Sequence, residues 1–205
     1  MKKVLQIVLA LVVIGLAVWL YTSIMAPIHF KKEVDMRENA VKAKLLDIRA
    51  AQQAYRSVHA EYTPSFDSLI HFVLNDSLTF TRQIGDPDDS LAVARGEVYF
   101  EDFRIPAQDT VFSRKLSRQD ILDLPTIPYS DNKQFFLNAG HVVTDSHLVV
   151  PVFECSAPYN YYLWDVDPRQ EVDNMIDEAI NTRGAYPGLK VGDMKAATND
   201  AANWD

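Results

Sequence analysis

The chain has 205 residues, of which 48% are hydrophobic and 23% charged, a balance typical of folded proteins rather than disordered ones. Its formal net charge of −8 argues against nucleic acid as a partner, because phosphates require a basic face. The single cysteine, Cys155, excludes an intramolecular disulfide framework and any paired-cysteine site.

An uncharged apolar segment, VLQIVLALVVIGLAVWLYTSIM, runs from Val4 to Met25. A helix of about 20 residues spans the hydrocarbon core of a bilayer, so this segment is long enough to cross a membrane. A cleaved signal peptide usually has an apolar core of about 7–15 residues and a small-x-small exit, which Ile24-Met25-Ala26 does not match. We therefore predict a retained membrane anchor over residues 1–26, with residues 4–25 in the lipid bilayer.

Two opposing signals bear on the orientation of this anchor. More basic residues follow the span than the two lysines that precede it, so charge counting alone favours a cytoplasmic head. The basic residues that follow the span are Lys31, Lys32, Arg37, Lys42 and Lys44. A short basic start before an apolar run is nevertheless typical of bacterial export, and long domains translocate largely regardless of flanking charge. We predict a single-pass inner-membrane protein with most of the chain in the periplasm.

Residues 27–63 are predicted to form a stem helix, with a kink at Pro27 where the stem leaves the span. Apolar residues recur at three-, four- and seven-residue steps up to about His59, and no glycine or proline interrupts them after Lys31. The members of this apolar stripe are Val34, Val41, Leu45, Ile48, Ala51, Tyr55 and Val58.

The apolar stripe has two interpretations. It packs against the protein's own head, or it forms a bundle with partner helices, although Arg37 and Gln52 interrupt any strict heptad. In the second case the candidate partner-binding residues are Val34, Val41, Leu45, Ile48 and Tyr55.

Residues 64–205 are predicted to form an α+β head. Pro64 ends the stem, and Ser65 caps a short helix over Phe66–Val73. An acidic turn over Gly85–Ser90 precedes a strand within residues 91–105.

Three more strands are expected near Gln134–Leu137, His147–Glu154 and Asn160–Asp165, the last two joined as a hairpin by CSAPY. A late amphipathic helix over residues 168–184 ends at Gly184. Its apolar side consists of Val172, Met175, Ile176, Ala179 and Ile180.

The segment AYRSVHAEYTPSFDSL, with Ala54, Tyr55, Tyr62, Pro64 and Leu69, follows the stem in a way that resembles type IV pilins and pseudopilins. The resemblance covers roughly residues 1–75 and implies an antiparallel sheet packed on the stem. The chain departs from that family in lacking the leader glycine and the glutamate within the span, on which processing and filament assembly depend. The resemblance therefore implies a pilin-like head on an unprocessed anchor.

The tail AYPGLKVGDMKAATNDAANW and the stem segment RAAQQAYRSVHAEYTPSFDSLI resemble single-pass Gram-negative envelope proteins that accompany ExbB/ExbD-type subunits of TonB systems. A proton-carrying ExbD subunit needs a carboxylate within its span, and residues 4–25 contain none. The resemblance implies an accessory subunit of such an energised transport motor, with integral inner-membrane proteins as partners.

No nucleotide-binding, hydrolase or EF-hand motif occurs, and we predict no enzymatic activity, cofactor or metal ion. His141, Asp145 and His147 would ligate a metal only if a turn brought them together, and a surface loop is the alternative. The acidic turns would suit calcium or would simply be solvated loops. Their carboxylates are Asp86, Asp88, Asp89, Asp165 and Asp167.

Cys155 is expected to be a small core residue rather than a nucleophile. The aromatic run YNYYLW, together with Phe135 and Phe136, would either pack in the core or stack on sugars. The favoured function is therefore a scaffold or accessory subunit of an envelope complex. The alternatives are a minor pseudopilin-like component of a secretion or pilus machine, and an anchored cell-wall or carbohydrate-binding protein. Homo-oligomerisation stays open.

Overall fold

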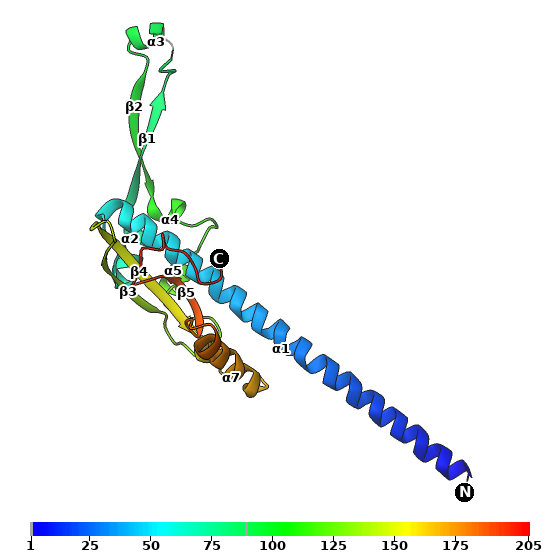
Figure 1. The fold of residues 1–205 in the computed structure, drawn as a ribbon. Coiled ribbons are helices and arrows are strands. Elements are labelled where there is room, and N and C mark those ends of the chain that lie inside the picture. Colours follow the sequence, from blue (N-terminus) through cyan, green and yellow to red (C-terminus); the bar gives the residue numbers. More distant parts are fainter. Residues whose placement is uncertain (1, 89) are drawn as a thin grey trace.

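A computed structural model describes residues 2–88 and 90–205 and consists of one long helix that carries a mixed α+β head at its C-terminal end (Figure 1). The elements in chain order are α1 (Lys2–His59), α2 (Phe66–Asn75), β1 (Ser77–Ile84), α3 (Ser90–Ala94), β2 (Tyr99–Pro106), α4 (Ala107–Thr110), α5 (Arg118–Leu122), β3 (Phe136–Val143), β4 (Val149–Pro158), α6 (Tyr159–Tyr162), α7 (Arg169–Asp177), the π-helical turn Glu178–Thr182 and β5 (Gly188–Gly192).

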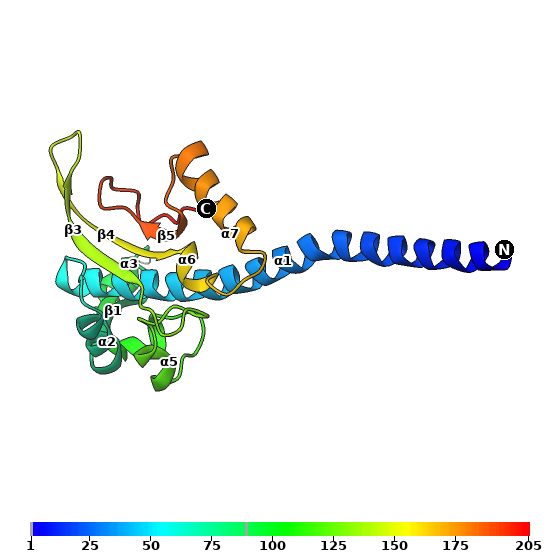
Figure 2. The ribbon, with the colours of Figure 1, turned by 90° about the horizontal axis from the view of Figure 1, so that it is seen from below.

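Helix α1 is a single helix of 58 residues, and it ends at His59, which is as far as the apolar periodicity extends and is short of residue 63, the predicted end of the stem. Within residues 2–88 and 90–205 it is the one helix long and apolar enough to cross a membrane, and its apolar part is not buried inside the molecule. The helix continues through Pro27, and Figure 2 shows only a shallow bend where the apolar part passes into the stem. The same length and composition fit a membrane anchor or a signal sequence.

The C-terminal half of α1 lies between two layers of the head (Figure 2). On one side is the antiparallel sheet β3–β4–β5, with β4 in the centre, and on the other are α2 and α5. The pair β1–β2 forms a second antiparallel sheet of its own. The mixed α+β class is thus confirmed, with two small sheets.

The apolar stripe of the stem forms the centre of the head's core. Val41, Leu45, Ile48 and Ala51 have no exposed surface. Val58 differs from the expectation and is 52% exposed. The reason is that Tyr55 and His59 take the contact of this last helical turn with the ring of Phe72 in α2.

The two polar residues that interrupt the stripe are buried, and each holds a head loop against the stem. Arg37 donates to the Tyr162 carbonyl at 3.0 Å and to Glu33 at 2.8 Å, and pairs with Asp165. The hydrogen bond and charge of Arg37 lower the pKa of Asp165. The guanidinium also lies 5.2 Å from the ring centroid of Tyr129.

Gln52, which has no exposed surface, makes a closed pair with the backbone of Thr63. Its amide nitrogen donates to the Thr63 carbonyl at 2.6 Å, and its amide oxygen accepts from the Thr63 N–H at 3.1 Å. This pair fixes the chain reversal that follows the stem. The next helix begins as predicted, because the Ser65 hydroxyl accepts from the Ser68 N–H and caps α2.

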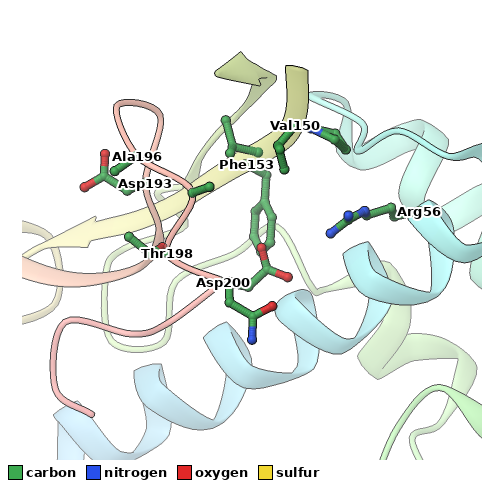
Figure 3. A pocket seen from close by; sticks show the side chains of 11 residues that line it. Arg56, Val150, Phe153, Asp193, Ala196, Thr198 and Asp200 are labelled. Atoms are coloured by element: carbon green, nitrogen blue, oxygen red, sulfur yellow. The ribbon is translucent and has the colours of Figure 1, made fainter. Parts of the chain in front are cut away.

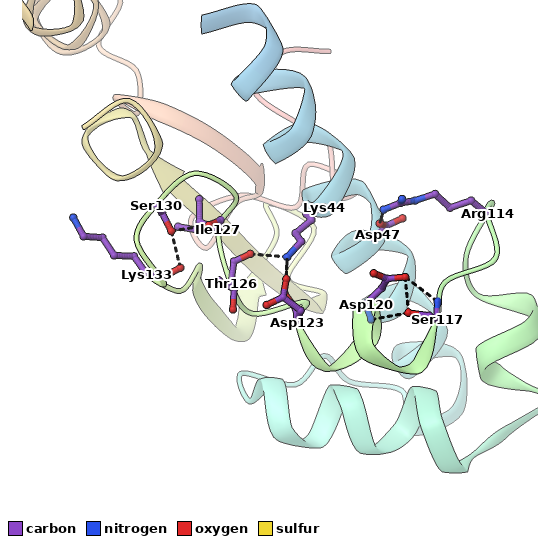
Figure 4. Close-up of polar contacts among 10 residues, drawn as sticks. All are labelled: Lys44, Asp47, Arg114, Ser117, Asp120, Asp123, Thr126, Ile127, Ser130 and Lys133. Atoms are coloured by element: carbon purple, nitrogen blue, oxygen red, sulfur yellow. Dashed lines mark hydrogen bonds and ion pairs between the residues drawn. The ribbon is translucent and has the colours of Figure 1, made fainter. Parts of the chain in front are cut away.

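A second set of polar contacts binds the link after α5 to the stem (Figure 4). The Lys44 ammonium donates to the Asp123 carboxylate at 2.6 Å and to the carbonyls of Asp123 and Thr126 at 2.7 and 2.9 Å. Asp47, one turn further along, accepts from Arg114 at 2.6 Å. The polar edge of the stem is therefore occupied by the head on this side as well.

Three strand predictions are corrected by the structure. Residues 91–96 form α3 and a turn, and the strand begins only at Tyr99. Asn160–Asp165 is not a strand, because α6 and a turn occupy it. The segment CSAPY is not a hairpin link, since Cys155, Ser156 and Ala157 continue β4 and pair with Val191, Lys190 and Leu189 of β5.

The strands expected near Gln134–Leu137 and His147–Glu154 are present, shifted toward the C-terminus as β3 and β4. The predicted late helix is present as α7 and the π-helical turn, and Gly184 follows with a left-handed φ of 58°. Val172 and Ala179 are buried, whereas Ile180 is 49% exposed. A π-helical turn holds more residues than an α-helical one, so it rotates Ile180 off the apolar side.

Tyr162 is fully buried, and within the described residues its hydroxyl has no hydrogen-bond partner. Burial raises the pKa of this phenol. Because an unsatisfied buried hydroxyl destabilises a protein, we expect Tyr162→Phe to raise the free energy of unfolding by about 1 kcal/mol. Urea denaturation of the full chain in detergent measures this change, and Tyr161→Phe, at a half-buried neighbour, is the matched control. A loss of stability in Tyr162→Phe would contradict the prediction.

Candidate interaction surface

An arm formed by residues 77–88 and 90–106 extends from the head (Figure 1). It consists of β1 and β2 with α3 near its tip, and it projects from the end of the molecule opposite the N-terminus. Strand pairing runs from Ser77 opposite Pro106 at the base to Ile84 opposite Tyr99 near the tip. A two-stranded ribbon is marginally stable alone, so such an arm favours contact with another surface.

One face of the arm is apolar, since alternate residues of a strand point to the same side. We call this the apolar arm face, and its members are Leu78, Phe80, Ile84, Tyr99, Phe103 and Ile105. Phe80 and Phe103 stack with their ring centroids 5.8 Å apart. They are 36% and 40% exposed, and Tyr99 is 52% exposed.

One charged pair lies within the apolar arm face. Arg82 donates to Glu101 at 2.8 Å, from positions that oppose each other between the phenylalanine pair and the tip. Both side chains are exposed. On the other face the pairing is mainly polar, as when the Thr81 hydroxyl donates to Asp102 at 2.6 Å.

The base of the arm is fixed to the head. The Ala107 N–H donates to the Asp76 carbonyl at 2.9 Å, which closes the ribbon where it joins α2 and α4. Leu78 packs against the head's core. In the apolar arm face, Leu78, Ile84 and Ile105 are half-buried, whereas Phe80, Tyr99 and Phe103 are exposed.

The residues predicted to bind partner helices lie under the head. Val34 is 6% exposed, Val41, Leu45 and Ile48 have no exposed surface, and Tyr55 is half-buried. Within this chain they pack against the protein's own head, which is the first interpretation of the apolar stripe.

The C-terminal tail is bound to the stem beside a cavity of about 160 Å³ (Figure 3). The Tyr62 hydroxyl donates to the buried Asp200 carboxylate at 2.7 Å, and the Gln53 amide donates to the same carboxylate at 3.0 Å. Burial, together with the bond to Asp200, raises the pKa of Tyr62. Arg56, which also lines the cavity, donates to the Tyr62 hydroxyl at 3.0 Å, so Arg56 and Asp200 both bind the tyrosine that attaches the tail.

An open groove of about 900 Å³ lies where the stem meets the link between α6 and α7. Phe30, Met36 and Val166 give it an apolar wall, and Lys32 and Asp167 place charges beside that wall. Ala26, the first residue after the apolar segment, also lines the groove. If residues 4–25 span a bilayer, the groove lies next to its surface.

The residues considered for metal binding do not converge. Among the described residues, no group of three or more His, Cys, Asp or Glu side chains could hold an ion. His141 on β3 lies 3.8 Å from Glu61, and His147 lies in the turn between β3 and β4. Of the acidic residues considered, Asp165 pairs with Arg37, and Asp89 lies outside the described residues.

Cys155 is fully buried in β4, and burial raises the pKa of its thiol. In the aromatic run, Tyr159 and Tyr162 belong to the core, whereas Trp164 is 51% exposed. The Trp164 indole donates to the Tyr129 carbonyl at 3.1 Å. Cys155 is thus the core residue that the sequence predicts, and most of the run is packed rather than presented.

The strand β1 and the arm that it forms with β2 were not among the predicted elements. A signal was present, because SLTFTRQI alternates apolar and polar residues as a half-exposed strand does. Its pairing with YFEDFRIP across the acidic turn is what converts two short patterns into a projecting surface.

Comparison of the chain with known protein families, with curated proteins and with solved structures found no match in any of the three.

Proposed function

We propose that this protein is a scaffold or accessory subunit of a multiprotein complex in the bacterial cell envelope, with a structural rather than a catalytic role. Residues 4–25 anchor it in the inner membrane, and the head lies in the periplasm. The observation that carries the proposal is the unbroken helix α1, whose N-terminal part is apolar and exposed and whose C-terminal part is the core of the head.

The exposed apolar part of α1 supports the membrane anchor. The large hydrophobic side chains from Ile7 to Ile24 are each more than half exposed, and Leu11, Trp19 and Tyr21 exceed 60%. A patch of this size in water would drive association, whereas in lipid it is satisfied. The rings of Trp19 and Tyr21 lie near the C-terminal end of residues 4–25, and such rings prefer the interface between membrane and water.

The packing of the stem supports a positional role for the head. Because α1 passes without a break from the apolar segment into the core, the head has no flexible linker that would let it move freely from the membrane. Arg37 and Lys44 fasten further loops to the same helix. The arm is thereby held out at one end of this rigid unit, where it can contact another subunit.

The partners we propose are integral inner-membrane proteins of an energised transport motor of the ExbB/ExbD type. This choice rests on the resemblance of the tail and stem, and on the lack of any carboxylate within residues 4–25. A subunit without such a carboxylate does not carry the proton itself, so it would brace or position the subunits that do.

The layout of a long N-terminal helix against an antiparallel sheet also favours a second candidate, a minor pseudopilin-like component of a secretion or pilus machine. In a processed pseudopilin the N-terminal leader is removed, whereas an anchor keeps residues 4–25. Peptide mapping of the protein isolated from membranes therefore separates the two. Processing at the start of the apolar helix would favour the pilin-like candidate.

The test of the proposed function is purification of the full chain from native membranes in mild detergent, through a tag after Asp205. We expect integral membrane subunits to be recovered at a fixed ratio, identified by mass spectrometry. The matched control carries the same tag and the substitution Leu11→Arg with Ile14→Arg, which disrupts the span on its exposed surface. Recovery of the wild-type protein alone would contradict the proposal.

A further inference from the structure

The apolar arm face is complementary to a second copy of itself. We propose that two copies of this protein pair through their arms, face to face and pointing in the same direction. The inference rests on the proposed function only in treating the arm as a contact surface, and it specifies the partner of that surface as an identical chain.

The first support is the make-up of the face. The aromatic rings of Phe80, Tyr99 and Phe103 lie on one side of a ribbon only two strands wide and are more than a third exposed. Nothing in the described head covers them. A ribbon of this kind gains stability when another layer packs on it, as one sheet packs on a second in a β-sandwich.

The second support is the charge pattern, which restricts what the covering layer can be. Arg82 and Glu101 lie among the apolar residues and pair with each other, so a purely apolar partner would remove both charges from water and offer no hydrogen bonds to their remaining polar atoms. A suitable partner presents an acidic group opposite Arg82 and a basic group opposite Glu101, with apolar residues on either side.

A second arm meets this requirement in one orientation. Rotation by half a turn about the long axis of the arm places β1 of one copy against β2 of the other. Residues that are neighbours in the ladder then face each other across the interface, so Arg82 of each copy meets Glu101 of its partner, and Phe80 meets Phe103. In the antiparallel orientation with the arms fully overlapped, β1 faces β1 and position 82 lies opposite position 79, so neither Arg82 nor Glu101 meets an opposite charge of the partner's face.

The parallel orientation also suits two chains anchored in one bilayer, since both arms then point away from their spans. The size of the face explains why anchoring matters. Eight residues per strand give a length of about 26 Å, and two strands give a width of about 10 Å, so a pair buries roughly 500 Å² in total. Stable interfaces bury about 1,200 Å² or more, so pairing requires the high local concentration that a shared membrane provides.

The experiment uses a charge swap that leaves each arm intact. In the variant Arg82→Glu with Glu101→Arg, the ion pair within the arm is kept, with its signs exchanged. Two swapped chains then match each other as two wild-type chains do. A swapped chain opposite a wild-type chain places Glu against Glu and Arg against Arg.

Pairing is read by cross-linking cysteines with a short bis-maleimide between two differently tagged full-length chains co-expressed in membranes, because facing strands of packed sheets lie about 10 Å apart, further than a disulfide spans. One chain carries Ile84→Cys and the other Tyr99→Cys, which face each other in the proposed pair. Gln83→Cys with Phe100→Cys is the control on the opposite face. The native Cys155 is fully buried and does not contribute to the cross-link.

We expect wild-type pairs and swapped pairs to cross-link equally, and mixed pairs to cross-link roughly tenfold less. The opposite-face cysteines are expected not to cross-link. The swap Arg183→Glu with Glu178→Arg, at an exposed ion pair away from the arm, is expected to pair normally with wild type.

Absence of the wild-type cross-link, equal cross-linking of matched and mixed pairs, or capture of a different protein by the arm cysteines would each overturn the proposal. If membrane subunits are still recovered through the C-terminal tag in that case, the proposed function stands without arm pairing. If neither self-pairing nor membrane subunits are found, both proposals fail.

Discussion

Replacing Gln52 by leucine is expected to lower the free energy of unfolding by about 3 kcal/mol. The Gln52 side chain is fully buried and pairs with both backbone groups of Thr63, at 2.6 and 3.1 Å. Thr63 is itself only 5% exposed. Leucine keeps the volume but leaves a buried N–H and a buried carbonyl without partners, and each such loss costs about 1–3 kcal/mol.

Urea denaturation of the full chain in detergent, followed by tryptophan fluorescence, measures this loss, because Trp164 and Trp204 both lie in the head. The matched control is Gln53→Leu, the same change one residue along. Gln53 is exposed and makes one hydrogen bond, to Asp200, so its loss is expected to stay below about 1 kcal/mol. Equal losses in the two variants would show that the backbone of Thr63 does not depend on Gln52.

The Leu45→Ala variant is expected to lose about 3 kcal/mol of stability, while Leu46→Ala loses less than about 0.5 kcal/mol. The two residues are adjacent and chemically identical, but Leu45 has no exposed surface and Leu46 is 38% exposed. Truncation at Leu45 removes buried methyl groups and leaves a cavity in the core of the head, whereas truncation at Leu46 changes a partly exposed side chain.

This comparison also tests the two interpretations of the apolar stripe. If the head covers the stripe, Leu45→Ala destabilises the purified protein in the absence of any partner. The midpoint of its urea denaturation curve then falls, and the slope of the unfolding free energy against urea concentration is unchanged. If partner helices covered it instead, the variant would keep the stability of the purified chain and lose association. An unchanged midpoint in Leu45→Ala would therefore contradict the core position of this residue.

The stem and the arm differ in what covers their apolar surfaces. The apolar stripe of the stem packs against the protein's own head. Because α1 is continuous, this packing holds the head in a fixed position relative to residues 4–25. The arm leaves its apolar surface exposed, at the far end of that rigid unit. If two copies pair through their arms, the contact would couple two spans at a distance set by the head.

Several elements were predictable because they depend on neighbours three and four residues away. The stem ends at His59 as its periodicity indicates, Ser65 caps α2, and Gly184 follows the late helix with positive φ. Helix-forming periodicity and capping are local properties, so one sequence is enough to reveal them. The burial of Val41 and Ile48 follows from the same periodicity.

The strand pairing was not predictable in the same way. Cys155–Ala157 pairs with Leu189–Val191, more than thirty residues further along, and the sequence suggested a local hairpin instead. The apolar–polar alternation of β1 was visible, but only its pairing with β2 places Arg82 beside Glu101 and produces a projecting face. Such pairs are selected by the packing of the whole head.

By itself, the sequence determined the apolar segment, the stem and its apolar stripe, the helix capped by Ser65 and the late helix, because hydrophobic periodicity and chain breaks act locally. Only the tertiary structure decided the order of the strands, the formation of the arm, and the hydrogen-bond partners of Arg37 and Gln52. These two residues break the apolar pattern of the helix, and their partners Asp165 and Thr63 become neighbours only when the chain folds back on the stem. A polar group can be buried when distant parts of the chain supply its hydrogen bonds, and folding alone brings those parts together.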